Sequence, residues 1–214
     1  MPQHAQRVSP PRTLNVPFIL GRPLGAPGDP GLQHRVLDAA LALLNRNDGP
    51  VSEDFEEDVA AGPQNEEPWV CPVTFARDDT TRSLPEKVLA EIALLQPWYD
   101  KGRSARGGAT SVGLSGMDIT SIVNYLGRFM TDDIPAEENA GEQLKHAAED
   151  LKAFYNEAAT SQPGHSTAHE LESWYWQESV AGKLVRDISQ ACGQNDNGMI
   201  KLTASFLLVP ETQR

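Results

Sequence analysis

Two side chains in this sequence have the chemistry of catalytic groups, and the first is Cys71. It lies in the short apolar segment Trp69–Val73, where Pro72 restricts the preceding residue to an extended backbone, so the thiol points into a core or a cleft. A thiolate nucleophile needs a pKa lowered by a nearby cation or helix N-terminus, and no histidine or lysine lies close by in the sequence. Cys71 is therefore either a small buried hydrophobic residue or a catalytic thiol activated from elsewhere in the fold.

The second candidate is Glu178, which falls on the apolar line of a helix that we expect from Thr167 to Cys192. Its helical neighbours include Trp174 and Tyr175. A carboxylate among aromatic rings has a raised pKa, because burial disfavours its charged form, and this is how proteins make general acids. The alternative is a glutamate at the edge of the aromatic line that reaches solvent or pairs with an arginine. We take Cys71 and Glu178 as the predicted catalytic residues.

A turn-rich loop between Gly21 and Asp29 is the predicted substrate-binding segment. Arg22 stands beside Gly21 and close to Gly25, so a carboxylate could approach the guanidinium closely and bind it in a bidentate manner. The sequence before this loop, Val16–Leu20, predicts a short strand. The sequence after it predicts a helix that Asp29 caps, with proline in its first turn.

Three other segments have residues that could bind a ligand or a metal. The basic, glycine-rich stretch Lys101–Thr110 is either a flexible linker or a cradle for an anion or an acidic partner surface. His165 and His169 lie near acids, and Glu53–Asp58 is an acidic run, but both lack the full spacing of a known metal site. We therefore assign no metal ligands, and a metal-dependent enzyme stays only as a weaker alternative. The cofactor stays unknown, because the sequence has neither a dinucleotide-binding glycine motif nor a P-loop.

Composition limits the partners of the chain. Its 214 residues carry a formal net charge of −12, which argues against nucleic acid and anionic membranes as partners. The sequence has no apolar stretch of membrane-spanning length and no apolar core of a signal peptide, so we expect a cytoplasmic protein. Cys71 and Cys192 stand in unrelated contexts, and reduced thiols are the simpler interpretation.

The elements around these residues are mostly helical. Capping signals and apolar spacing predict helices from Ser83 to about Pro97, from Ser115 to Met130 and from Ala136 to Thr160, followed by the helix that carries Glu178. Pro97 either ends or kinks the first of these helices, and Ser115 and Asp118 open the second. The last apolar run, Ile200–Val209, fits a helix slightly better than a strand. We predict a mainly α fold, α+β at most. Residues 1–82 form an extended arm, strand, helix and acidic loop that dock on a partner, and residues 83–214 form a helical domain.

Residues 10–54 resemble the C-terminal part of selenoprotein B of the glycine, sarcosine, betaine and D-proline reductase family. The resemblance is carried by Pro10-Pro11-Arg12, Val16-Pro17-Phe18, Leu20–Gly25, Pro27–Pro30 and the helix to Leu44. The family's catalytic cysteine or selenocysteine lies upstream of this segment, in an α/β region that this chain lacks, so the resemblance does not assign that role to Cys71.

The resemblance implies a smaller subunit of a hetero-oligomeric oxidoreductase that acts on a small molecule at a subunit interface. A larger α/β subunit would carry the missing part of the family fold. The lone predicted strand fits this, because its backbone groups need a sheet to pair with, and strand addition to a partner would supply one. Two alternatives stay open: a non-catalytic assembly or regulatory subunit that braces a catalytic partner, and a metal-dependent enzyme.

Overall fold

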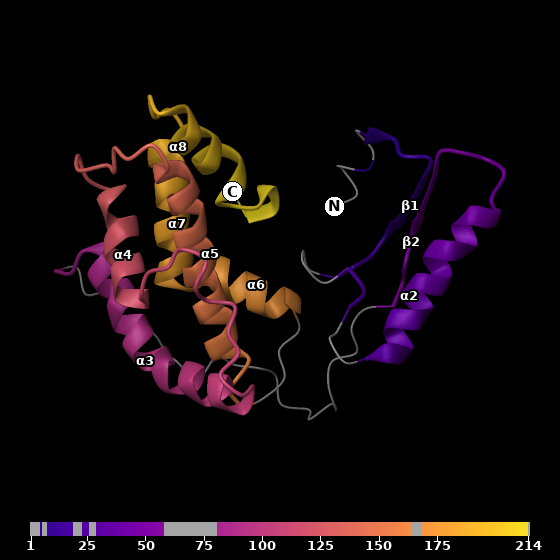
Figure 1. Ribbon diagram of the computed structural model, residues 1–214, viewed down its shortest axis with the longest axis horizontal. Helices are drawn as coiled ribbons and strands as arrows, with labels where there is room; N and C mark the ends of the chain where they lie inside the picture. The colour runs from indigo at the N-terminus through magenta and orange to yellow at the C-terminus, as the bar shows by residue number, and fades with distance from the viewer. Residues whose placement is uncertain are drawn as a thin grey trace. The chain divides into compact units, whose positions relative to one another are not determined.

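The computed structural model in Figure 1 describes residues 5, 8–18, 23–25, 29–57, 81–163 and 168–213. The chain divides into two compact units: residues 1–65 with 167–169, called the N-terminal unit here, and residues 66–166 with 170–214, called the helical unit. The described residues are mainly helical with one short sheet, which confirms the predicted fold class. The predicted domain boundary after residue 82 stays a prediction.

The N-terminal unit is a strand–helix–strand arrangement. It contains β1 (Arg12–Asn15), α2 (Pro30–Ala42), the short 3₁₀ turn η1 (Leu43–Asn45) and β2 (Val51–Asp54). The two strands pair in parallel, with Arg12 opposite Val51 and Asn15 opposite Asp54. Parallel neighbours need a long crossover connection, and α2 provides it.

The strand predicted at Val16–Leu20 lies earlier in the chain, at Arg12–Asn15. The observed strand also has a partner within the chain, which is β2. Val16–Phe18 follow β1 without strand pairing, whereas the more polar sequence of β1 pairs with the start of the predicted acidic loop. Local β-propensity favoured the wrong residues, because pairing between segments far apart in the sequence decided the position. The helix start was predicted correctly, since Asp29 Oδ1 accepts a hydrogen bond from the Leu32 N–H at 3.0 Å.

The helical unit is built around α5 (Ala140–Ala159), which contacts α3, α4, α7 and α8 (Figure 1). The other elements are α3 (Leu84–Ala105), α4 (Ile119–Arg128), α6 (Ala168–Gln177), α7 (Val180–Cys192), α8 (Gly198–Leu202), the π-helical turn η2 (Thr203–Leu207) and the 3₁₀ turn η3 (Glu211–Gln213). Each of the helices α3 to α8 contributes side chains to one core. Within the described part of the chain, no helix has the length and apolar character needed to cross a bilayer.

The predicted starts of several helices in this unit are confirmed. Two predictions about where a helix ends or continues are wrong. The capping pair Ser83 and Glu86 opens α3, where the Ser83 N–H donates to Glu86 Oε2 at 2.7 Å. Of the two predictions for Pro97, an end or a kink, the end is wrong, because α3 continues through Pro97 to Ala105. The helix expected from Thr167 to Cys192 is two helices, because Ser179 caps a new one by accepting from the Gly182 N–H at 2.9 Å.

Candidate functional site

One face of α2 is apolar and exposed in the N-terminal unit. The apolar residues of this helix and of η1, which continues it, form two neighbouring lines, and the line of Leu32, Val36 and Leu43 is buried. The second line is open, with Leu37 43% exposed, Leu41 59% and Leu44 65%. We call Leu37, Leu41 and Leu44 the α2 stripe. Scattered exposed leucines are ordinary, but three on one helix face in succession are typical of a contact surface.

The sheet beside α2 is polar on one face. Because side chains alternate along strands, Asn15, Ser52 and Asp54 share a face. They are joined by hydrogen bonds, from Asn15 Nδ2 to Ser52 Oγ at 3.1 Å and to Asp54 Oδ1 at 2.9 Å. Among the described residues the sheet has only two strands, so each strand has one edge without a strand partner. A partner would therefore be expected to pair with an edge rather than cover this face.

The apolar core of the N-terminal unit is small. The buried apolar side chains in its described residues are Leu32, Val36, Leu43 and Val51. The rings of Phe18 and Phe55 add an edge contact with centroids 6.1 Å apart, and the ion pairs of the unit are exposed, as in the Arg35–Glu57 pair at 2.8 Å. Exposed ion pairs contribute little to stability, and parallel sheets normally have both faces covered. Within its described residues, the unit is thus a short segment of α/β structure with an unfinished sheet.

Of the predicted substrate-binding residues, only Gly25 is among the described residues; Gly21 and Arg22 lie outside them. Gly25 is buried and has a φ of +87°, a conformation that favours glycine. A Cβ at this position would lie 2.7 Å from Leu32 Cδ2 and 3.3 Å from Phe18 Cζ. Glycine is therefore required here for close packing of the loop against α2. This packing fixes the loop at Gly25, near its middle, but does not test the predicted binding role.

The two predicted catalytic residues are not brought together by any described contact. Cys71 lies outside the described residues. Glu178 is exposed in the turn between α6 and α7, which agrees with the alternative in which it reaches solvent and not with packing among the aromatic rings. The helix breaks at this position, which turns the side chain out of the apolar line. Its role as an acid stays a prediction.

Glu91 of α3 is the carboxylate that does lie among the aromatic side chains. It is 3% exposed and accepts hydrogen bonds from Tyr155 Oη at 2.8 Å and from the Val180 N–H at 2.9 Å. Burial raises the pKa of Glu91 to about 7, and the hydrogen bonds from Val180 and Tyr155 only partly oppose this. Since Val180 is the first residue of α7, Glu91 joins the start of that helix to α3 and α5.

The spacing along α3 could have identified Glu91. It lies three residues after Val88 and four before Leu95, on the face predicted to be buried. Both of its oxygens accept from the Val180 N–H, and Oε2 also faces Ala181 N at 3.4 Å. These contacts and its burial make Glu91 a structural link that binds protons near neutral pH, and not a group that meets a substrate.

The basic stretch Lys101–Thr110 is neither a free linker nor an open anion site. Its first half belongs to α3, and the anion it holds is the protein's own Glu157 on α5. Arg106 Nη2 donates to Glu157 Oε2 at 2.6 Å, and the Ser111 N–H donates to Oε1 at 2.6 Å. Two turns earlier on α5, Asp150 receives the backbone N–H groups of residues 113–115 at 2.8 to 2.9 Å. The two carboxylates thus fasten the loop between α3 and α4.

The structure describes only some of the residues that we considered as metal ligands. His165 lies outside the described residues, and His169 is exposed near the start of α6. Among the described residues, no three histidine, cysteine or acidic side chains are grouped as a metal site would require.

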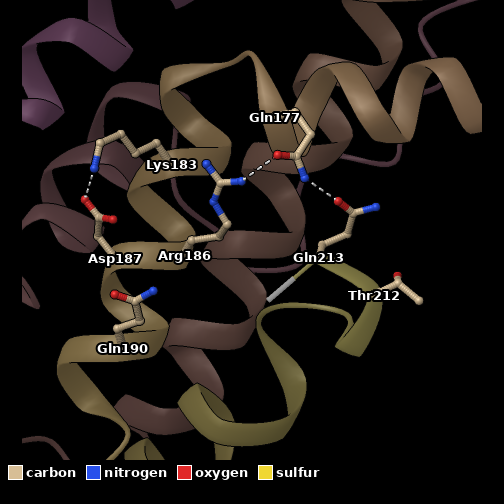
Figure 2. Close-up of a pocket in the computed structure, with 7 residues that line it drawn as sticks. All are labelled: Gln177, Lys183, Arg186, Asp187, Gln190, Thr212 and Gln213. Carbon is tan, nitrogen blue, oxygen red and sulfur yellow. Dashed lines mark hydrogen bonds and ion pairs between the residues drawn. The ribbon is translucent and has the colours of Figure 1, made fainter.

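A polar pocket of about 380 Å³ lies between α7, the end of α6 and the C-terminal turn η3 (Figure 2). Lys183, Arg186 and Asp187 of α7 line it, and Gln177 and Gln213 form its opposite side. Lys183 Nζ pairs with Asp187 Oδ2 at 2.6 Å, while Gln177 Nε2 donates to Gln213 Oε1 at 2.8 Å. No local sequence pattern indicates this pocket, because η3 brings Thr212 and Gln213 to α7 from a later part of the chain.

The comparisons with known proteins add no family to this geometry. No protein-family model, curated protein or solved structure matches the chain.

Proposed function

We propose that this chain is the smaller subunit of a hetero-oligomeric, cytoplasmic oxidoreductase resembling the glycine, sarcosine, betaine and D-proline reductase family. Its N-terminal unit docks on a larger α/β subunit, and the assembly acts on a small molecule at the interface. The observation that carries the proposal is the unfinished sheet next to the α2 stripe. A two-stranded parallel sheet with a small core gains stability when a partner extends the sheet and covers the helix face.

The docking follows from the two surfaces of the N-terminal unit. A strand edge offers unpaired backbone N–H and C=O groups, which a partner strand satisfies with regular hydrogen bonds. The α2 stripe adds apolar burial at about 25 cal/mol for each Å² removed from water. The two surfaces belong to adjacent elements, so one α/β partner can engage both.

The chemistry in this proposal rests on residues that sequence analysis singled out. Cys71 supplies the thiol and Glu178 an acid, while Arg22 with Gly21 and Gly25 binds a negatively charged group of the substrate. The fixed packing of Gly25 against α2 supports one part of this arrangement, because it ties the loop to the helix that carries the stripe. Docking of α2 would then also position the loop at the interface.

Purification with an identified partner tests the proposal. The tagged chain is expressed in its native cells, and the co-purifying protein is identified and then co-expressed with it. We expect a partner with an α/β fold, a stable complex, and reductase activity that requires both chains. A chain that purifies alone as an active monomer would contradict the proposal.

Two variants locate the contact. Leu41→Glu places a charge on the α2 stripe and should weaken the complex by about tenfold or more, because a buried unpaired charge is costly. Leu94→Glu is the matched control, since Leu94 is 49% exposed on α3 in the helical unit and Leu41 is 59% exposed. Equal effects of the two substitutions would show that the stripe is not the docking surface.

A non-catalytic subunit that braces a catalytic partner is the second candidate, and the same α2 stripe favours it. Replacing Cys71, Arg22 and Glu178 one at a time in the reconstituted complex separates the two functions. Loss of turnover in any variant whose complex still assembles supports a catalytic contribution. Unchanged turnover in all three supports bracing alone.

A further inference from the structure

The pocket beside α7 contains an arginine whose hydrogen-bonding capacity is almost unused. Arg186 is half-buried, and its one described polar contact runs from Nη1 to Gln177 Oε1 at 3.5 Å. This is the upper limit of a hydrogen bond and contributes little. A guanidinium has five N–H donors, so most of those on Arg186 have no acceptor among the described residues.

The surroundings hold the guanidinium at the pocket. Gln177 is fixed by its bond to Gln213, and Figure 2 shows Arg186 between Gln177 and the Lys183–Asp187 pair. Arg186 is three residues after Lys183 on α7, so both cations lie on the same face of the helix. The side chains on either side of Arg186 are therefore held by their own contacts, Gln177 with Gln213 and Lys183 with Asp187.

The charge of the pocket indicates which ligand fits. Lys183 and Arg186 contribute two positive charges and Asp187 one negative charge, which leaves a net charge of +1. One monoanion neutralises this charge, whereas a dianion leaves an excess negative charge close to the Asp187 carboxylate. The planar guanidinium also matches the geometry of a carboxylate, which it can bind through two parallel hydrogen bonds.

We propose that this pocket is a binding site for the carboxylate of a small monoanionic ligand, with Arg186 as its principal contact and Lys183 as a second positive charge. Its volume of about 380 Å³ is suited to a compact molecule of a few heavy atoms beyond the carboxylate. The site lies in the helical unit and does not depend on the proposed docking of the N-terminal unit.

Titration of the full-length protein with sodium acetate tests the site. Nuclear magnetic resonance signals of the Arg186 Nε–H and the Gln177 side-chain amide report binding, while sodium chloride holds the ionic strength constant. We expect saturable shifts of both signals at acetate concentrations up to about 50 mM. Inorganic phosphate at pH 8, where it is mainly a dianion, should bind more weakly than acetate.

Variants assign the contact. Arg186→Gln should weaken acetate binding by about tenfold or more, because it removes charge-assisted hydrogen bonds, and Lys183→Gln by a smaller factor. Arg128→Gln is the control, because it removes one positive charge outside the pocket, where Arg128 pairs with Asp133 at 3.0 Å. Non-saturable shifts, equal binding by Arg186→Gln, or tighter binding of phosphate than acetate would each overturn the proposal.

Discussion

The pH dependence of stability gives the sharpest prediction for the helical unit, and it depends on Glu91. The pKa of this carboxyl is raised from 4.5 to about 7, mainly by burial. The folded protein therefore binds the Glu91 proton more tightly than the unfolded chain does. The stability that this proton confers is complete below about pH 4.5 and is lost as the pH rises through 7. With about 1.4 kcal/mol for each pKa unit, the total loss is about 3 kcal/mol.

Substitution of Glu91 by glutamine should remove this dependence. The glutamine oxygen can still accept from the Val180 N–H and from Tyr155, while the side chain carries no charge at any pH. We expect the free energy of unfolding of the unmodified chain to fall by about 3 kcal/mol between pH 5 and 8, and that of Glu91→Gln to stay nearly constant over this range. Urea titrations followed by the fluorescence of the buried Trp174 and Trp176 would measure both.

The matched control is Glu178→Gln, the same substitution at an exposed carboxyl in the turn before α7. It should leave the pH dependence unchanged. If the unmodified chain became more stable between pH 5 and 7, or if Glu91→Gln showed the same slope as the unmodified chain, the assignment of a raised pKa to Glu91 would be refuted. A flat profile for Glu178→Gln alone would instead support the original sequence prediction for that residue.

Two further substitutions test packing in the helical unit. Asp150→Asn should destabilise it by about 2 kcal/mol and speed hydrogen exchange at residues 113–115, because one oxygen that accepts their N–H groups becomes an amide donor; unchanged exchange would contradict this. Gly182→Ala should cost about 1 to 3 kcal/mol in urea unfolding, since its Cβ would lie 2.0 Å from the Tyr175 carbonyl oxygen. Gly198→Ala, which meets nothing within 4 Å, is the control and should change stability by less than about 1 kcal/mol.

The effect of Asp150 on pH dependence has the opposite sign to that of Glu91. Burial acts to raise the pKa of Asp150, but hydrogen bonds from Ser115, Gly113 and Leu114 outweigh it, so the pKa lies below its usual value. The stability from Asp150 is therefore present above the usual pKa of 3.8 and is lost as the pH falls through the lower folded value. The two carboxyls act in separate pH ranges, which allows the Glu91 effect to be measured alone.

The sequence predicted the features that are set by local chemistry. The sequence predicts Asp29 as a helix cap and Asp118 as one of two residues that open α4, and both side chains accept hydrogen bonds from the first turn of their helices. The apolar spacing of α4 and α5 was also read correctly, because long helices buried along one face repeat their pattern over many residues. These signals need no knowledge of distant parts of the chain.

The errors concern features that depend on distant segments or on breaks in a continuous pattern. The apolar line on which Glu178 was placed runs through α6 and α7 without interruption, so periodicity hid the break. The serine at position 179, preceded by Gln177 and Glu178, was the available signal of a new helix start. The pairing of β1 with β2 joins residues nearly forty positions apart, and no local pattern indicates it.

The two units differ in how far their own residues can hold them together, and this difference bears on function. The helical unit buries side chains from every helix between α3 and α8, and its carboxylates Glu91, Asp150 and Glu157 are used in internal contacts. In its described residues, the N-terminal unit has few buried apolar side chains, a two-stranded sheet and the open α2 stripe. A small apolar core gives little stability on its own. If the proposed α/β partner binds the N-terminal unit, we expect binding to stabilise that unit, whereas the core of the helical unit is formed by its own helices.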